Sequence, residues 1–412
     1  MISVLKYGNG ATLRLDLSDA TQLILCETPR GQPMDDLAAA VRRALDQPLE
    51  LPPLARAVVP GDKVALAVAE PIGEITTIVA QTIEMLVAAG VAAQDITVVH
   101  AQGDHWLGTA QWNVAGAHVV IHDPTQRESL SYLAASAEGK PIYINRTIHD
   151  ADLVISIGRV WPEGSLGDHG MHAGLLAAFS DTANRDRYHS PKPSLPAQRD
   201  RLRTDADEAG WLLGAGYTIR VVPGPGGAVQ EVIAGEIAAV DRRARAVYNQ
   251  AWRCPIVARA ELVIATIEGD ASQQTWENVA RALDSAAHAA GSEAAIAVCS
   301  ELAEPPGAGL QQLMGAESLS DALRAIVHHK PADSLAAGAV VRAVERGSVY
   351  LLSRLEDEVV EDLGMRPLKA SELSRLASHY RSVLVIPNAP YAVAQLKEEA
   401  GIVRKKQGKL PR

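Results

Sequence analysis

The pattern of apolar positions in the first half of the chain is typical of a parallel α/β sheet. Residues 63–69 (KVALAVA) form a continuous apolar run, as buried parallel strands do, and residues 95–101 (DITVVHA) repeat it. Between them, residues 76–89 have the spacing of an amphipathic helix that ends at Gly90. These three segments predict a βαβ unit, and the runs at 117–123 and 140–160 predict further strands.

A second series of strands and helices begins near Pro255. Strand patterns at 261–267, 294–300, 347–353 and 382–388 alternate with helical stretches, of which residues 274–290 (QTWENVARALDSAAHAA) are the clearest. A chain of 412 residues also exceeds the roughly 250–300 residues at which single cores stop growing. We therefore predict two α/β domains, residues 1–255 and a smaller domain 256–412, with mixed, largely parallel sheets and a ligand cleft between them.

Glycine-rich segments exclude several nucleotide-binding classes. The stretch 223–227 (PGPGG) has prolines where a GxGxxG turn would need to enter a helix, so we predict a rigid surface turn there. The sequence has no P-loop, no GxSxG elbow and no kinase signature. A dehydrogenase with an ordinary nicotinamide cofactor is disfavoured for the same reason.

The net charge and the cysteine content bear on the protein's binding partners and on its cellular compartment. The net charge of −10 opposes binding to nucleic acid or to anionic membranes, and the basic tail 404–412 is expected to be a solvated terminus. The three cysteines are far apart and form no CxxC pair, which fits a reducing compartment. With neither a signal-peptide pattern nor a long apolar run, a cytoplasmic protein is expected, and a homodimer is compatible with these features.

The first candidate for chemistry lies after the strand 95–101. Gly103 and His105 stand in the QGDHW segment, where a parallel sheet presents side chains to a cleft. Imidazole titrates near neutrality and suits proton transfer or metal ligation. The alternative is a histidine that only orders its loop.

The second candidate is the Gly- and His-rich passage 161–196, whose length is typical of functional loops. It contains Glu163, Asp168, His169, His172 and His189. His169 and His172 would share one face if their segment were helical, and imidazoles there could bind nickel, copper or zinc. The alternative is a polar loop with incidental histidines.

The third candidate lies on the helix 274–290. Glu277 and Arg281 are spaced to form an i,i+4 ion pair, which would be worth a few tenths of a kcal/mol, roughly, on a helix surface. If the helix faces the cleft, Arg281 can instead bind a substrate carboxylate through two hydrogen bonds, with Asn278 beside it.

The order of these pieces resembles the nickel-dependent lactate racemase family. The resemblance covers roughly residues 60–300 and is carried by DITVVHAQGDH, by YINR and ADLVISIGR, by the Gly/His-rich loop ending in RYHS, and by ALDSAAHA. It implies a nickel-pincer nucleotide between two domains and interconversion of the two configurations of a 2-hydroxy acid. The cofactor takes hydride from the alpha carbon and returns it, while two bases handle the hydroxyl proton.

The resemblance assigns roles to four positions in the first domain. His105 matches the first catalytic histidine, and Glu163 replaces the second, so that a carboxylate with a raised pKa would have to act on the opposite face unless His169 or His172 does. His189 matches the nickel ligand. Ala173 replaces the lysine that tethers the cofactor, so any cofactor is expected to bind without a covalent link. The remaining cofactor-binding residues predicted on this basis are Glu70, Gly103, Asp168, His169 and His172.

The substrate contacts are altered as well. Gly73 stands where the family has an arginine, whereas Asn278 and Arg281 match a glutamine and a lysine. Losing one charge-assisted contact costs on the order of 1.5–3 kcal/mol, which argues against lactate itself. The sequence thus predicts a racemase or epimerase of another 2-hydroxy acid. The alternative is a catalytically degenerate paralogue that binds a nucleotide, a metal or a protein partner, because Gly73, Glu163 and Ala173 depart together from the family pattern.

Overall fold

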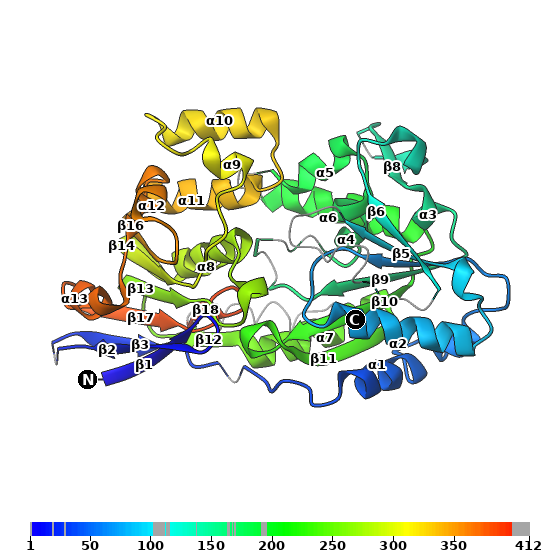
Figure 1. Cartoon of the computed structure of the whole chain (residues 1–412), viewed down its shortest axis with the longest axis horizontal. Helices are drawn as coiled ribbons and strands as arrows, with labels where there is room; N and C mark the ends of the chain where they lie inside the picture. The colour runs from blue at the N-terminus through cyan, green and yellow to red at the C-terminus, as the bar shows by residue number, and fades with distance from the viewer. Residues whose placement is uncertain are drawn as a thin grey trace, which may run out of the picture.

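The computed structural model describes residues 2–18, 20–28, 30–101, 112, 116–136, 138–162, 165–166, 168, 170–190 and 196–397. Within these residues it contains two six-stranded sheets, one in each half of the molecule, with helices packed against both (Figure 1). The predicted fold class, two α/β units with largely parallel sheets, is confirmed.

The first sheet has the strand order β11-β10-β9-β4-β5-β6, parallel throughout except for the antiparallel pair β10–β11. Its strands are β4 (Val64–Val68), β5 (Ile96–Ala101), β6 (His118–His122), β9 (Leu153–Arg159), β10 (Tyr217–Pro223) and β11 (Val229–Glu236). The helices around it are α1 (Leu37–Asp46), α2 (Ile75–Ala88), α3 (Arg146–His149), α4 (Ala173–Phe179), α5 (Thr182–Tyr188), α6 (Pro196–Leu212) and α7 (Ile237–Trp252). The predicted βαβ unit is β4–α2–β5.

The apolar run of β4 is buried on both faces, and its two faces differ in size. Val64, Leu66 and Val68 pack with α1 and α2, whereas Ala65 and Ala67 pack with residues of α4 on the other side. Alternating large and small side chains therefore let a helix approach one face of the sheet closely. The prediction of a buried parallel strand is confirmed.

The second sheet has the strand order β16-β15-β14-β13-β17-β3, and all of its pairs are parallel. Its strands are β3 (Gln22–Leu25), β13 (Ala260–Thr266), β14 (Ala290–Cys299), β15 (Val349–Leu352), β16 (Arg366–Pro367) and β17 (Ser382–Ile386). On one side lie α8 (Trp276–Ala289) and α11 (Ser334–Arg346); the other side is covered by the hairpin β1 (Ile2–Tyr7)–β2 (Ala11–Asp16) and α13 (Leu373–Ala377).

The N-terminal segment belongs to the second sheet. Figure 1 shows β1, β2 and β3 beside β13 and β17, and β3 pairs with β17 at the sheet edge. The predicted bounds 1–255 grouped these strands with the first domain, because an apolar pattern identifies a strand without identifying its pairing partner. The predicted change at Pro255 falls within β12 (Arg253–Ile256), which follows α7 and precedes β13.

The turn at 223–227 is not a surface turn, so that prediction is wrong. It forms the 3-10 helix η5 (Pro225–Gly227), in which Gly226 has a φ of +63°. A Cβ on Gly226 would lie 3.2 Å from the Cα of Gly269, and the Gly226 N–H donates to Oδ1 of Asn388 at 3.0 Å. Glycine is needed here because the backbones of the two domains meet at this turn.

The remaining elements connect these layers. They are β7 (Leu130–Ala135), β8 (Pro141–Asn145), β18 (Val393–Leu396), α9 (Ala308–Gln311), α10 (Leu319–His329), α12 (Asp357–Asp362), η1 (Leu54–Arg56), η2 (Ala93–Asp95), η4 (Arg127–Ser129), η6 (Ala271–Gln273) and η7 (Ala370–Glu372). None of the helices placed in the described segments has both the length and the apolar character that a membrane crossing requires.

Candidate functional site

A cavity of about 830 Å³ lies between the two domains. On one side it is lined by residues at the carboxyl ends of β4, β5 and β9 and by residues of α4 and α5. On the other side it is lined by η6, the first turns of α8 and the start of α11. Carboxyl ends of parallel strands are where open α/β sheets bind ligands, so this cavity is the candidate site.

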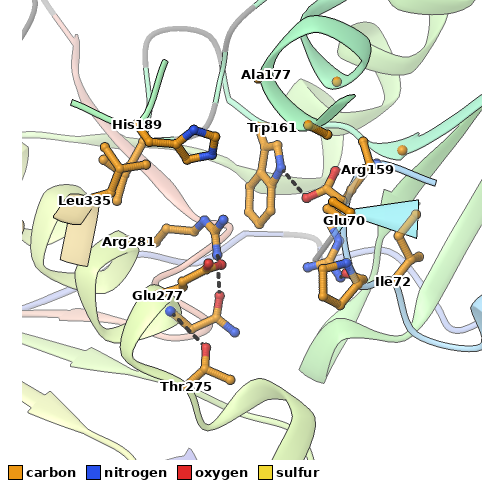
Figure 2. Close-up of a pocket in the computed structure, with 18 of the residues that line it drawn as sticks. Glu70, Ile72, Arg159, Trp161, Ala177, His189, Thr275, Glu277, Arg281 and Leu335 are labelled. Carbon is orange, nitrogen blue, oxygen red and sulfur yellow. Dashed lines mark hydrogen bonds and ion pairs between the residues drawn. The ribbon is translucent and has the colours of Figure 1, made fainter. Parts of the chain in front are cut away.

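Glu70 follows β4 and lines the cavity, where its carboxylate is held from two sides. Oε1 accepts the backbone N–H of Arg159 at 2.7 Å, and Oε2 accepts Nε1–H of Trp161 at 2.9 Å. The Glu70 carboxylate thereby orients the Trp161 indole, as the dashed line in Figure 2 shows. Glu70 was predicted to bind a cofactor; within the chain it also holds the Trp161 side chain in position.

A row of aromatic and cationic side chains connects the domains at the cavity. The rings of Trp161 and Tyr391 are stacked, with centroids 5.9 Å apart and planes at 15°. Cζ of Arg281 lies 4.0 Å from the Trp161 ring centroid, a cation–π contact. The Tyr391 hydroxyl accepts Nη1–H of Arg159 at 2.8 Å and donates to Oε1 of Gln273 at 2.6 Å.

The predicted substrate residues Asn278 and Arg281 both line the cavity, on α8. Thr275 caps this helix by accepting the Asn278 N–H, and Oδ1 of Asn278 accepts Nη1–H of Arg281 at 3.1 Å. Nη1 of Arg281 also lies 3.4 Å from Oε2 of Glu277, a carboxylate that is 59% exposed. Nε of Arg281 is buried without a hydrogen-bond partner among the described residues. The pair with Glu277 agrees with the surface ion-pair interpretation, but such an exposed pair is weak. The buried Nε–H without an acceptor agrees with the ligand-binding interpretation, because a ligand can supply that acceptor.

His189, the predicted metal ligand, follows α5 and lines the cavity. Its Nδ1 lies 2.9 Å from the backbone oxygen of Arg185 and must donate to it, so Nε2 is the nitrogen that carries the lone pair. Burial, and secondarily the Arg185 charge, lower the pKa of His189, which keeps the ring neutral at pH 7. Figure 2 shows the ring directed toward Trp161, on the same side as Arg281.

Two predicted cofactor residues have other partners. His172 stands at the N-cap of α4 and precedes its first helical residue. The His172 ring packs on Gly210, with Nδ1 3.1 Å from Oδ1 of Asp207, and it is not among the residues that line the cavity. Asp168 does line the cavity, but Arg203 and Arg245 both donate to its carboxylate.

The positions His105, Gly103, Glu163 and His169 lie outside the residues that the structure describes. Their predicted roles therefore stay predictions. Ala173 is the first residue of α4.

Gly73 lies where two backbones come close. A Cβ on Gly73 would be 2.9 Å from the backbone oxygen of Gly227, in the turn that joins the domains. A longer side chain at this position would need the loop to move, so the glycine is part of how the two loops pack.

Arg220, which no sequence motif singles out, lies on β10 opposite Gly158 of β9. Its side chain is 8% exposed and lines the cavity, and Nη2 donates to the backbone oxygen of Met171 at 2.6 Å. Gly158 makes room for the guanidinium, because a Cβ there would lie 2.5 Å from Nη1. A single arginine inside the apolar run 217–223 was the available signal.

No three His, Cys, Asp or Glu side chains gather into a possible metal site within the described segments. His189 is accordingly a candidate for a single protein ligand to a metal whose other ligands belong to a bound group. The described side chains do not form a metal site whose ligands all come from the protein.

Comparison with known proteins finds a family match for residues 7–190 and two similar solved structures. Residues 7–190 match the family model of the lactate racemase N-terminal domain. The fold matches the lactate racemase apoprotein of Thermoanaerobacterium thermosaccharolyticum, with a TM-score of 0.74 and 16% identity over 96% of this chain and all of that one. It also matches a Thermotoga maritima protein from a structural genomics programme, with a TM-score of 0.65 and 14% identity over 89% of this chain and all of that one. No curated protein sequence matches the chain.

Proposed function

We propose that this chain is an isomerase that racemises or epimerises a 2-hydroxy acid other than lactate, because residues 7–190 match the family model of the lactate racemase N-terminal domain and the fold matches a lactate racemase apoprotein. The observation that carries this proposal is the cavity between the domains, which has the His189 imidazole and the Arg281 guanidinium in its lining. One group suits a metal-bearing cofactor and the other a carboxylate.

The residues that line the cavity fit a nickel-pincer type of nucleotide. A volume of about 830 Å³ is within the range of cofactor pockets, which is roughly 300–1,000 Å³. His189 offers a neutral imidazole whose other nitrogen is fixed by the Arg185 carbonyl, the arrangement that orients metal-ligating histidines. With alanine at position 173, the cofactor would be held without a covalent tether. When bound, it would supply an acceptor and donor of hydride.

Arg281 and Asn278 would hold the substrate carboxylate. The Nε–H of Arg281 has no acceptor among the described residues, so a bound ligand can supply one, and the weak pair with the exposed Glu277 is easily replaced by a stronger one. Trp161 lies against the Arg281 guanidinium and keeps it in place. The carboxylate would thus be fixed on the second-domain side of the cavity.

Proton transfer would fall to His105 and Glu163. His105 would take the proton from the C2 hydroxyl oxygen on one face of the substrate, and Glu163 would do the same on the other face. A carboxyl group can return that proton near neutral pH only if its pKa is raised above its ordinary value.

The substrate is expected to be larger than lactate. The family's arginine is replaced by Gly73, which packs against Gly227 and offers no charge, so one charge-assisted contact worth about 1.5–3 kcal/mol is missing. A longer hydroxy acid or polyol acid can regain this free energy through additional polar contacts in the cavity.

The test is to produce the full chain together with the enzymes that build the nickel-pincer nucleotide. Elemental analysis and native mass spectrometry should find one nickel and one nucleotide-sized mass per chain, and His189→Ala should lose the nickel. The loaded protein should then exchange the C2 hydrogen and invert the C2 centre of at least one acid in a broad 2-hydroxy acid panel. Arg281→Met should raise KM by about 10- to 100-fold, the equivalent of a lost charge-assisted hydrogen bond.

A loaded protein that turns over nothing in the panel would contradict the isomerase proposal. The alternative, a degenerate paralogue, is favoured by the simultaneous replacements at Gly73, Glu163 and Ala173. It predicts no turnover of any acid in the panel, and a co-produced protein that carries neither nickel nor a nucleotide would favour it further.

A further inference from the structure

Arg185 brings a positive charge to the part of the cavity that belongs to the first domain, and the described residues supply it with no counter-ion. It lies on α5 and lines the cavity, and its Nε is buried without a hydrogen-bond partner. In the portion of the chain that is described, no carboxylate forms an ion pair with it. The guanidinium is therefore both partly desolvated and unmatched.

The two carboxylates whose charges act on Arg185 are bound to other groups. Asp186 accepts an ion pair from Nζ of Lys330 at 2.9 Å. Asp123 accepts the N–H of Thr125 at 2.8 Å and its hydroxyl at 2.6 Å, which lowers the pKa of Asp123. Burial lowers the pKa of Arg185 by more than the charges of Asp186 and Asp123 raise it, and no described carboxylate forms an ion pair with the guanidinium.

The cavity that Arg185 lines also has short, uncharged side chains in its first-domain lining. Ala69 and Ala101 at the ends of β4 and β5, with Ala177 and Ala178 of α4, line the same cavity. These alanine side chains offer no hydrogen-bond acceptor and no charge of their own to the guanidinium. An unpaired guanidinium in such a setting costs free energy that an anionic ligand removes.

We infer that Arg185 anchors the phosphate group of a bound ligand, separate from the carboxylate site at Arg281. The planar guanidinium matches phosphate oxygens through two parallel hydrogen bonds. Arg185 stands on the first domain and Arg281 on the second, so one ligand or two ligands bound side by side would present anions to both walls of the cavity. This site does not depend on the isomerase proposal, because it requires only binding.

The phosphate can come from two sources, and the probes separate them. Inorganic phosphate represents the free anion, and ribose 5-phosphate and nicotinamide mononucleotide represent a nucleotide. Each is titrated calorimetrically into the full chain at constant ionic strength. Tighter binding of the two esters than of inorganic phosphate assigns the site to a nucleotide, and equal binding assigns it to phosphate as such; either result requires saturable binding and supports the site.

The decisive variants change only this side chain. Arg185→Met should weaken phosphate binding at least tenfold, whereas Arg185→Lys keeps the charge but loses the fork and should fall between Met and the wild type. Arg242→Met is the matched control, because Arg242 is 65% exposed, pairs with Glu50 and does not line the cavity. It should bind phosphate as the wild type does.

Thermal stability separates a ligand-binding role from a structural one. In phosphate-free buffer Arg185→Met should melt at or above the wild-type temperature, since it removes an unmatched buried charge, and added phosphate should raise its melting temperature no more than the general salt effect does. Wild-type phosphate affinity in Arg185→Met would overturn the inference. So would a loss of several degrees in phosphate-free buffer together with an unchanged response to phosphate.

Discussion

The indole of Trp161 and the phenol ring of Tyr391 are stacked across the boundary between the two domains, 5.9 Å apart and nearly parallel. Trp161 follows β9 of the first sheet, and Tyr391 lies between β17 of the second sheet and β18. Tyr391 is 2% exposed and also packs on Trp252 of α7. One wall of the ligand cavity is therefore itself part of the domain interface, so substitutions there should change stability as well as binding.

Tyr391→Phe should destabilise the protein by about 1–2 kcal/mol. It keeps the ring stack but removes the hydroxyl, which leaves Nη1 of Arg159 without its acceptor and Oε1 of Gln273 without its donor. Urea unfolding followed by fluorescence measures the change. Tyr132→Phe, at a ring that is 56% exposed, is the control and should be neutral. Equal stability of both variants would mean that the hydroxyl does not link the domains.

Glu70→Ala should cost about 1–3 kcal/mol of stability and shift the tryptophan emission. The substitution leaves the Arg159 N–H and the Trp161 Nε1–H without their acceptor and frees the indole to move. Glu70→Gln, which retains one acceptor oxygen, should lose less. Glu293→Ala, at an exposed position of β14, should leave both stability and emission unchanged. An unaltered emission spectrum in Glu70→Ala would contradict the orienting role.

Gly158→Ala should destabilise the first domain by about 1–3 kcal/mol, because the new methyl group would lie 2.5 Å from Nη1 of the buried Arg220. The matched control is Gly216→Ala. A Cβ at that position meets nothing within 4 Å. Melting temperatures of the two variants give the comparison, and a Gly158→Ala protein as stable as the control would show that Arg220 can rearrange without cost.

Stability should fall below about pH 6.5 through His122. This buried ring has Nε2 2.9 Å from the Ser180 oxygen and Nδ1 3.2 Å from Nδ2 of Asn145, an arrangement that requires the neutral form. Burial lowers the pKa of His122, so the unfolded chain binds the proton first as the pH falls. The neutral His122 ring contributes its full stabilisation when the pH is above the pKa that this histidine has in the unfolded chain. Below that pH the free energy of unfolding falls by at most about 1.4 kcal/mol per pH unit.

Unfolding measurements between pH 5 and 8 test this dependence. His122→Asn should be less stable at pH 8 and should show a flatter profile between pH 5 and 6.5. His118→Asn, at an exposed position of the same strand, should follow the wild-type profile. Parallel profiles for all three proteins would exclude His122 as the titrating group.

Much of the fold could be predicted from the sequence, because buried strands and helices have apolar patterns that can be read over a few neighbouring residues. The apolar run of β4, the amphipathic spacing of α2 and the strand end at Arg159 each appear within a few residues of the chain. The choice of which strands pair with one another has no such local pattern. The apolar pattern of β3 identifies a strand, but its union with β17 depends on contacts between distant segments, and so does the burial of the turn at 223–227 between the domains.

The candidate site was predictable only where a residue's type or motif position indicated a role. Asn278, Arg281, His189 and Glu70 line the cavity as the predicted ligand cleft requires. Tyr391 could not be predicted, because its role arises from stacking on Trp161 and from bonds to Arg159, both remote in sequence.

The pairing of β3 with β17 also affects how the protein is synthesised. Strand β3 leaves the ribosome early, whereas β17 begins at Ser382, about 360 residues later. At a translation rate of about 5–20 residues per second, the first strand waits roughly 20–70 s for its neighbour. During that time an apolar edge is open to other nascent chains. The second domain can close only when both ends of the polypeptide are present, so ribosome-bound chains that stop before Ser382 should depend on chaperones to remain soluble.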